Sequence, residues 1–330
     1  MAPDNGRYHC QPPKNTAKTE RRRALGTNPA RKRNGLRKVL ITGASGYVGK
    51  AALAALIRRR VPVVALGREP LALPDGSDFI RSDLLSEPDL ERVVAQAGAT
   101  HLMHLAWYAE HGKYWASPLN LAWVTATMRL IEAFAKAGGK AVAVAGSVAE
   151  YDWSYGYCRE AATPCAPATL YGTAKDAARR LAAAFCKDAA IPLGWARLFW
   201  NYGPGEAPTR LVPSLIAALR GQKPPFAVDA GAYRDFLHID DAGEGLVRLL
   251  EVEFDGPVNI ASGEPLRISD LVRTLASALN ADPSPILNLA AERQGEPRLV
   301  VGENARLRAL GWRPRHSLAD GLVSAFGAQS

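Results

Sequence analysis

The sequence predicts an α/β fold in which a parallel, doubly wound sheet is followed by a smaller C-terminal α/β lobe. Short apolar runs alternate with longer helical segments over residues 38–199, which is the pattern of a parallel sheet covered by helices. A glycine-rich turn separates the first apolar run from the first helical segment. The length of 330 residues also fits one large domain with a smaller lobe.

The elements of this fold follow in order along the chain. The predicted strands of the sheet are the apolar runs at residues 38–41, 61–66, 101–105, 141–145 and 193–199. The predicted helices between them are residues 48–57, 89–96, 119–136 and 168–187. After residue 204 the alternation loosens, and the remaining predicted elements are helices at 211–221, 240–251 and 269–280 and a strand at 258–260.

These elements predict a division of the chain into a cofactor domain and a substrate lobe. We expect residues 38–200, rejoined by about 235–252, to form a dinucleotide-binding domain. Residues 201–234 and 253–330 then form the smaller lobe, which includes the strand at 258–260. This lobe should lie against the carboxyl edge of the sheet, where doubly wound folds bind ligands.

The positive charge of the chain is concentrated at its N-terminus. The formal net charge is +9, and residues 1–38 hold eleven Lys or Arg side chains against two acidic ones, so the remaining chain is electrically balanced. A nucleic-acid-binding module needs a basic face on a folded domain or a recognisable motif, and neither is present. We therefore expect no nucleic-acid partner, and a disordered basic tail over residues 1–37.

The remaining composition predicts a soluble, cytoplasmic protein. No apolar run approaches the roughly 18 residues that cross a bilayer, and the N-terminus lacks the apolar segment of a secretory signal. We therefore expect no membrane partner. The cysteines are Cys10, Cys158, Cys165 and Cys186, and none forms a C-x-x-C pair. Neither a metal site nor a disulfide is expected from this spacing.

Residues 42–49 (TGASGYVG) follow the first predicted strand and open the first predicted helix. Glycines in this pattern permit a tight turn, a close approach of the backbone to a pyrophosphate, and close packing of helix on strand. The helix N-terminus adds free N–H donors for the anion. The residues predicted to bind a dinucleotide here are Gly43, Gly46, Tyr47, Val48 and Gly49.

The end of the second predicted strand bears on the choice of nicotinamide cofactor. Residues 66–68 (LGR) carry no carboxylate that could bind the hydroxyls of the adenosine ribose. The guanidinium of Arg68 suits a 2′-phosphate instead. We therefore expect NADP, with NAD as the alternative if Arg68 only stacks on the adenine.

Tyr171 and Lys175 are four residues apart on a predicted helix, so their side chains share one face. A tyrosine with its ordinary pKa of about 10 is a poor base at neutral pH. We expect the ammonium of Lys175 to stabilise the phenolate and lower the pKa of Tyr171. Ser147 follows the fourth predicted strand, where its hydroxyl could hold a substrate oxygen beside Tyr171. The predicted catalytic residues are Ser147, Tyr171 and Lys175.

These motifs, in this order and spacing, resemble the extended short-chain dehydrogenase/reductase family, in its branch of nucleotide-sugar epimerases, dehydratases and ketoreductases. The similarity spans residues 38 to about 325. Further matching segments are RLF at 197–199, YGP at 202–204, RDFLHIDD at 234–241, NIASGE at 259–264 and LGWRP at 310–314. The resemblance implies a Rossmann-like cofactor domain, a nucleotide-sugar substrate, and a homodimer formed by the helices near 119–136 and 168–187.

The resemblance also assigns further binding residues. Asp83 and Leu84 match the pair whose carboxylate holds the adenine amino group, and Ala106 lies in the strand end that lines the dinucleotide. Lys175 would also bind the nicotinamide ribose. Arg234 and Arg293 would grip the substrate diphosphate, since guanidinium groups fit phosphate oxygens.

The sequence departs from the family at two places. Trp200 stands where the family carries asparagine, and Asn201 follows. Either Asn201 reaches the diphosphate from a shifted position or Trp200 reshapes the sugar pocket. Val148 and Ala149 stand where 4,6-dehydratases carry their acid and base, which argues against a dehydratase. Glu150 follows them in an adjacent register whose direction the sequence leaves open, and the simplest interpretation is a surface carboxylate.

Two reactions need only the predicted catalytic trio. A reductase transfers hydride from NADPH to a 4-keto nucleotide sugar while Tyr171 donates a proton. A 4-epimerase removes hydride from C4 and returns it to the other face, usually with tightly bound NAD. The NADP pattern at Arg68 favours the reductase. A non-catalytic protein that senses NADP is a third hypothesis, which the intact trio disfavours.

Overall fold

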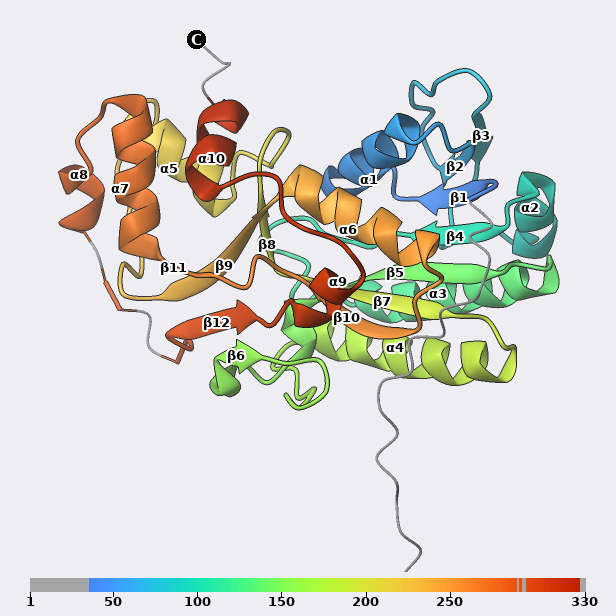
Figure 1. Ribbon diagram of the computed structural model, residues 1–330. Helices are drawn as coiled ribbons and strands as arrows, with labels where there is room; N and C mark the ends of the chain where they lie inside the picture. The colour runs from blue at the N-terminus through green and yellow to red at the C-terminus, as the bar shows by residue number, and fades with distance from the viewer. Residues whose placement is uncertain (1–35, 290, 293–294, 327–330) are drawn as a thin grey trace, which may run out of the picture. The chain divides into compact units, whose positions relative to one another are not determined.

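The computed structural model describes residues 36–289, 291–292 and 295–326. Its main sheet consists of β1 (Val39–Thr42), β2 (Val63–Gly67), β3 (Asp78–Arg81), β4 (His101–His104), β5 (Ala141–Ser147), β7 (Leu193–Leu198) and β10 (Gly256–Ile260). The strands are all parallel and lie in the order β10-β7-β5-β4-β1-β2-β3 (Figure 1). The predicted doubly wound parallel sheet is confirmed.

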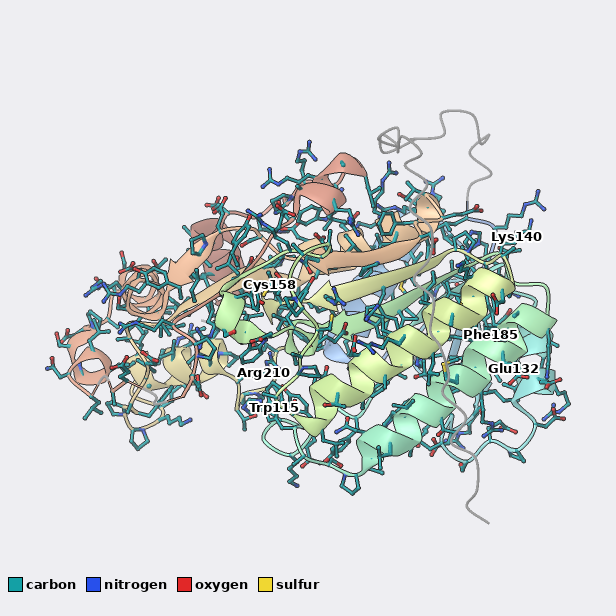
Figure 2. The ribbon with its side chains drawn as sticks, turned by 90° about the horizontal axis from the view of Figure 1, so that it is seen from below. Trp115, Glu132, Lys140, Cys158, Phe185 and Arg210 are labelled. Atoms are coloured by element: carbon teal, nitrogen blue, oxygen red, sulfur yellow. The ribbon has the colours of Figure 1, made fainter. Side chains whose placement is uncertain are left out.

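Helices cover both faces of this sheet. One face carries α1 (Tyr47–Arg58) and α6 (Ile239–Glu251), and the other carries α2 (Leu90–Ala97), α3 (Leu119–Lys136) and α4 (Leu170–Asp188) (Figures 1 and 2). Because both faces are buried, the central strands are continuous apolar runs without alternation. All four residues of β1 and all seven of β5 are buried. The sheet is therefore a rigid frame for the loops at its carboxyl edge.

The strand order reverses beside β1. From β1 the chain runs outward through β2 and β3, and then returns to β4 on the other side. Ligands bind in doubly wound folds at this reversal, outside the carboxyl ends of the strands. The segments that follow β1 and β4 therefore lie on the two sides of a ligand crevice.

A second, smaller sheet lies at the carboxyl side of the first. It is built from β6 (Tyr157–Cys158), β8 (Trp200–Tyr202), β9 (Tyr233–His238), β11 (Pro265–Arg267) and β12 (Leu299–Gly302). Its main path is β11-β9-β12-β6, and β8 pairs with β9. The helices α5 (Leu211–Leu219), α7 (Ile268–Leu279), α8 (Ser284–Leu287) and α10 (Leu318–Phe326) belong to this part of the chain (Figure 1). Two 3₁₀ turns, Val148–Glu150 and Trp153–Tyr155, and α9 (Ala305–Ala309) complete the described elements.

The strand expected in the smaller lobe at residues 258–260 is part of the main sheet instead. As β10 it pairs with β7 in parallel register. Val258 and Ile260 are fully buried and pack with residues of α6 in the main core. This packing explains the difference, because α6 offers β10 an apolar face beside β7. Among the described residues, no helix is long and apolar enough to cross a membrane.

Candidate active site

The glycine loop after β1 has the geometry of a cradle. Gly43 adopts a φ of +73°, which disfavours other residues. A Cβ at Gly43 would lie 2.6 Å from the backbone nitrogen of Ala106, and a Cβ at Gly49 would overlap the carbonyl oxygen of Gly43. The loop is therefore closed so tightly that only glycine fits at both positions.

The start of α1 is open to an anion. Gly46 is the N-cap residue and offers no side chain to the first N–H groups of the helix. The first turn, with Tyr47 and Val48, also contains no acidic residue. Unsatisfied N–H donors and the positive end of the helix dipole favour a phosphate group at this position. The residues present therefore fit a dinucleotide pyrophosphate.

The other predicted cofactor residues lie along the same edge of the sheet. Ala106 follows β4, and its N–H points to the hydroxyl of Thr42 at 3.4 Å. Arg68 follows β2 and is exposed. Asp83 and the buried Leu84 follow β3, and Oδ1 of Asp83 accepts a hydrogen bond from the N–H of Leu85 at 3.0 Å. The fold thus brings these residues to the carboxyl ends of β1 to β4.

The structure brings Ser147, Tyr171 and Lys175 together. Ser147 ends β5, and α4 places Tyr171 and Lys175 in its first two turns. Ser147 and Tyr171 lie close enough for the Ser147 hydroxyl to act on the pKa of the phenol. Nζ of Lys175 is buried and donates to the carbonyl oxygen of Ala145 at 2.8 Å, on the same strand as Ser147.

Burial determines the pKa values of Tyr171 and Lys175, and the shift of the Tyr171 pKa differs from the one expected. The pKa of Tyr171 is raised by burial, although the neighbouring hydroxyl of Ser147 opposes the shift. Burial also lowers the pKa of Lys175 to about 7. The expected lowering of the Tyr171 pKa by an adjacent ammonium is therefore wrong. Nζ of Lys175 lies 6.0 Å from the centre of the tyrosine ring and bonds to Ala145 instead.

An aromatic segment between β4 and α3 encloses the pair. The ring of Tyr171 meets Tyr114 at 4.8 Å and Trp115 at 5.7 Å between centroids, both edge to face. The Trp107 ring centre lies 3.8 Å from Nζ of Lys175. None of these three aromatic residues was predicted from the sequence to belong to the site. The signal was present, since residues 107–115 (WYAEHGKYW) contain four aromatic side chains.

Glu150 lies in the interior, and its expected surface position is wrong. Its side chain is fully buried, and Oε1 accepts hydrogen bonds from the N–H of Ser147 and from Nε1 of Trp195, both at 2.8 Å. Oε2 accepts from Nε of Arg197 at 2.7 Å. The 3₁₀ turn after Ser147 points the third residue inward. A turn of this kind has no period that a sequence pattern reveals.

The predicted substrate residues form a second group in the smaller sheet. The guanidinium of Arg234 lies 5.5 Å from the ring centre of Trp200 and donates to the carbonyl oxygen of Pro297 at 2.9 Å. Trp200 also packs against Trp153 at 5.8 Å. The amide of the buried Asn201 is directed to the carbonyl oxygen of Leu237 at 3.4 Å, away from this group. Arg293 lies outside the described residues.

Two further polar residues near the candidate site, Glu206 and Arg210, were not predicted from the sequence. The Glu206 side chain is almost fully buried, and its Oε1 accepts from Nε of Arg210 at 3.0 Å; within the described part of the chain, Oε2 has no hydrogen-bond partner. Burial raises the pKa of Glu206 to about 7. The charge of Arg210 acts on both Tyr171 and Tyr114, and Figure 2 shows Arg210 and Trp115 near the start of α4. The sequence after Gly203 and Pro204 has no pattern that would predict the pairing of Glu206 with Arg210.

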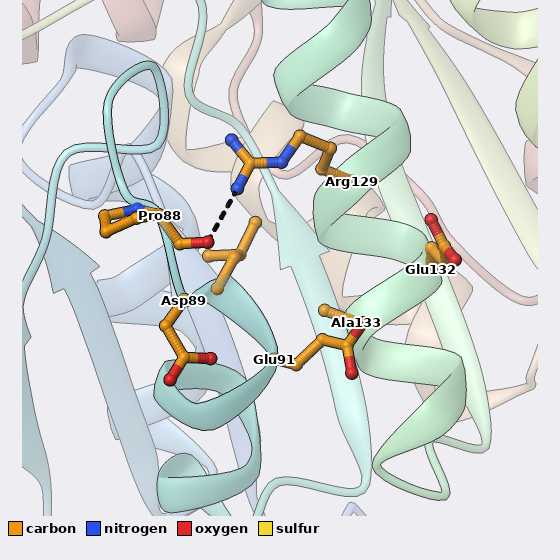
Figure 3. Close-up of a pocket in the computed structure, with 7 residues that line it drawn as sticks. Pro88, Asp89, Glu91, Arg129, Glu132 and Ala133 are labelled. Atoms are coloured by element: carbon orange, nitrogen blue, oxygen red, sulfur yellow. Dashed lines mark hydrogen bonds between the residues drawn. The ribbon is translucent and has the colours of Figure 1, made fainter.

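A cleft of about 200 Å³ lies between α2 and α3, away from these residues. Its lining includes Asp89, Glu91, Arg129 and Glu132 (Figure 3). Arg129 is directed to the carbonyl oxygens of Glu87 and Pro88, at 2.6 and 3.4 Å. The cleft contains none of the predicted site residues.

One group of described side chains has the composition of a metal site. Ligand atoms of His238, Asp240 and His316 lie within 4.8 Å of one another. The two histidine rings, however, stack at 3.9 Å with 26° between their planes. Stacked imidazoles direct their in-plane lone pairs side by side, so they do not converge on one ion.

The fold and the glycine loop together define a class of protein, a dinucleotide-dependent oxidoreductase. The family model for the NAD dependent epimerase/dehydratase family matches residues 39–261. The chain belongs to this family, in the extended short-chain dehydrogenase/reductase branch.

Individual relatives agree with this assignment. The chain is 25% identical over 269 residues to dTDP-6-deoxy-L-talose 4-dehydrogenase (NAD(+)) of Aggregatibacter actinomycetemcomitans, covering 80% of this chain and 98% of the relative. It is 26% identical to UDP-glucose 4-epimerase of Azospirillum brasilense, covering 87% and 90%. Among solved structures, MoeE5 in complex with UDP-glucuronic acid and NAD is 32% identical with a TM-score of 0.74, covering 87% of this chain and 97% of that one.

Proposed function

We propose that this protein is an NAD(P)-dependent oxidoreductase that reduces the 4-keto group of a nucleotide sugar. The observation that carries the proposal is the closeness of the Tyr171 phenol and the Ser147 hydroxyl at the edge of the sheet that holds the glycine loop. A substrate oxygen placed between these two hydroxyls would meet both a hydrogen-bond donor and a proton donor. Lys175, one helical turn further along α4, completes the trio.

The roles of the residues follow from their protonation. The bound nicotinamide supplies the hydride. Ser147 orients the carbonyl oxygen, and Tyr171 donates the proton that the forming alkoxide needs. Because burial raises the pKa of Tyr171, the phenol is protonated at neutral pH, as a proton donor must be. Val148 and Ala149 have no group that exchanges a proton, so elimination of water has no acid or base at these positions.

The cofactor that we propose is NADP, with NAD as the alternative. Arg68 supports NADP because its guanidinium is exposed at the end of β2, where the adenosine ribose of a bound dinucleotide would lie. The MoeE5 structure supports NAD, since that relative was solved with NAD. Asp83, Leu84 and Ala106 would line the same dinucleotide.

The nucleotide sugar would bind between the two sheets, with its diphosphate at Arg234 and Arg293 and its sugar near Trp200 and Asn201. We also propose the domain division given above, with β10 moved to the cofactor domain, a cytoplasmic location and a homodimer that pairs the helices α3 and α4. Exposed Leu121 on α3 and Leu181 on α4 support such a pairing, because burial of exposed apolar side chains favours association.

The alternative is an NAD-dependent 4-epimerase, which uses the same trio and which the similarity to UDP-glucose 4-epimerase favours. The purified protein should be denatured and its released nucleotides identified. It should then be assayed for NADPH and NADH oxidation with a dTDP-4-keto-6-deoxy sugar, and for interconversion of UDP-glucose and UDP-galactose. Oxidation of reduced cofactor supports the reductase. Retained NAD together with interconversion of the two sugars supports the epimerase. Cofactor binding without either reaction supports a non-catalytic protein that senses NADP.

A further inference from the structure

We propose that Trp107 is a positioning residue that holds the ammonium group of Lys175 against the face of its indole ring. Trp107 lies directly after Ala106 at the carboxyl end of β4, and its ring centre is 3.8 Å from Nζ of Lys175. A lysine within about 6 Å of an aromatic face is attracted by the ring quadrupole, most strongly for tryptophan. The inference rests on the proposed role of Lys175 in the catalytic trio.

The surroundings of Lys175 leave few other groups to stabilise its charge. Among the described residues Lys175 forms no ion pair, and its Nζ donates one hydrogen bond, to Ala145. The titratable groups that face it are Glu150 from the turn after β5, His104 from β4 and Tyr171 from α4. Burial opposes the ammonium form of Lys175, so the carbonyl oxygen of Ala145 and the aromatic face of Trp107 are the two groups in direct contact that compensate for it.

Neither His104 nor Glu150 replaces this contact. The ring nitrogens of His104 lie 2.7 Å from the hydroxyl of Thr42 and 2.9 Å from that of Thr127. Burial lowers the pKa of His104 to about 3, so the ring is neutral. The carboxylate of Glu150 already accepts hydrogen bonds from Ser147, Trp195 and Arg197.

The indole ring is itself held in place. Its Nε1 donates to Oδ1 of Asn120 at 2.8 Å, and Asn120 is fully buried. Nδ2 of Asn120 donates to the carbonyl oxygens of Tyr114 and Ser117, at 2.7 and 2.9 Å. Trp107 also stacks on Trp123 with 6.1 Å between ring centres. A ring anchored in this way can fix the direction of a flexible lysine chain.

Stability against pH tests this contact without any ligand. Because burial lowers the pKa of Lys175, the unfolded chain binds more protons above the folded pKa. The contribution of Lys175 to stability therefore increases as pH rises from about 7 toward the ordinary lysine pKa of about 10.4. This contribution is measured as the difference in unfolding free energy between proteins with Lys175 and with Lys175→Met, from pH 5 to 10.

Trp107→Leu removes the aromatic face, so the rise should begin about 0.5–1.5 pH units lower than in the parent protein. Trp107→Phe keeps a weaker face and should give a smaller shift in the same direction. It also decides the test if the leucine variant does not fold. Trp153→Leu, which removes a half-buried indole from another site, should give no shift. An unchanged onset in the Trp107 variants would overturn the proposal.

A second measurement links the contact to the cofactor. NADH binding is followed by the fluorescence of the reduced nicotinamide. The pH above which this binding no longer depends on pH should be lower in Trp107→Phe than in the parent protein. The difference should equal the shift in the stability onset. The stability experiment uses the protein alone. A shifted onset without turnover of any nucleotide sugar would therefore refute the proposed function and support the role of Trp107. Turnover of a nucleotide sugar with an unshifted onset would support the proposed function and refute the role of Trp107.

Discussion

The buried carboxylate of Glu150 accepts a hydrogen bond of 2.8 Å from the backbone N–H of Ser147, three residues earlier in the chain. The side chain of Ser147 in turn caps the same turn by accepting from the N–H of Ala149 at 3.1 Å. Through Arg197 and Trp195 the carboxylate also ties this turn to β7. The position of the candidate catalytic hydroxyl is therefore set by a buried ionic network beneath it.

Replacing Glu150 by glutamine should destabilise the protein by about 3–5 kcal/mol, because the buried guanidinium of Arg197 loses its counter-charge. The free energy of unfolding in urea measures this effect. Glu132→Gln is the matched control, since half of the Glu132 side chain is exposed, and it should change stability by less than about 1 kcal/mol. Equal losses in both variants would show that the network contributes nothing specific.

Tyr171→Phe should lower turnover by about 10²–10⁴-fold, because the substrate alkoxide loses its proton donor. The ring packing against Tyr114 and Trp115 remains, so NADH affinity should stay within about two-fold of the parent value. Steady-state rates and a fluorescence titration measure the two quantities. Full activity in the phenylalanine variant would remove Tyr171 from its proposed role.

The fold was predictable from local patterns because β1, β4 and β5 are buried on both faces and read as plain apolar runs. The glycine loop was predictable for a similar reason, since Gly43 and Gly49 have no space for a side chain. In both cases one short segment contains the whole physical cause.

The surroundings of the catalytic trio could not be predicted in this way. The pKa of Tyr171 depends on burial by Tyr114 and Trp115, which lie more than fifty residues earlier in the chain. Lys175 was expected to act on Tyr171, but its nearest partners come from β5 and from the segment after β4. β10 joined the main sheet because of its contacts with α6, which sequence periodicity does not show.

Arg68→Ala should weaken NADPH binding by about 10-fold or more and leave NADH binding within about two-fold. The reason is that a charge-assisted hydrogen bond to a 2′-phosphate exists only for NADPH. Fluorescence titration with both cofactors measures the ratio. Arg273→Ala, an exposed arginine on α7 in the smaller lobe, is the control and should change neither affinity. Equal weakening of both cofactors by Arg68→Ala would indicate stacking on the adenine and favour NAD.

Glu206→Gln should reduce the pH dependence of stability between about pH 4.5 and 7. Burial raises the folded-state pKa of Glu206 to about 7, above its ordinary value of about 4.3, so the folded protein binds more protons in this interval. Its contribution to stability is therefore fully present below about pH 4.3 and is lost as pH rises through 7. Glutamine keeps an acceptor for Arg210 but does not ionise.

The difference in unfolding free energy between Glu206→Gln and the parent protein should thus increase from pH 5 to pH 8, with a slope of at most about 1.4 kcal/mol per pH unit. Urea unfolding at four or five pH values measures it, with Glu132→Gln as the exposed control. Parallel curves for Glu206→Gln and the parent would mean that Glu206 is ionised throughout. Its unpartnered Oε2 would then have to be stabilised by a group other than Arg210, because a buried carboxylate oxygen without a donor is costly.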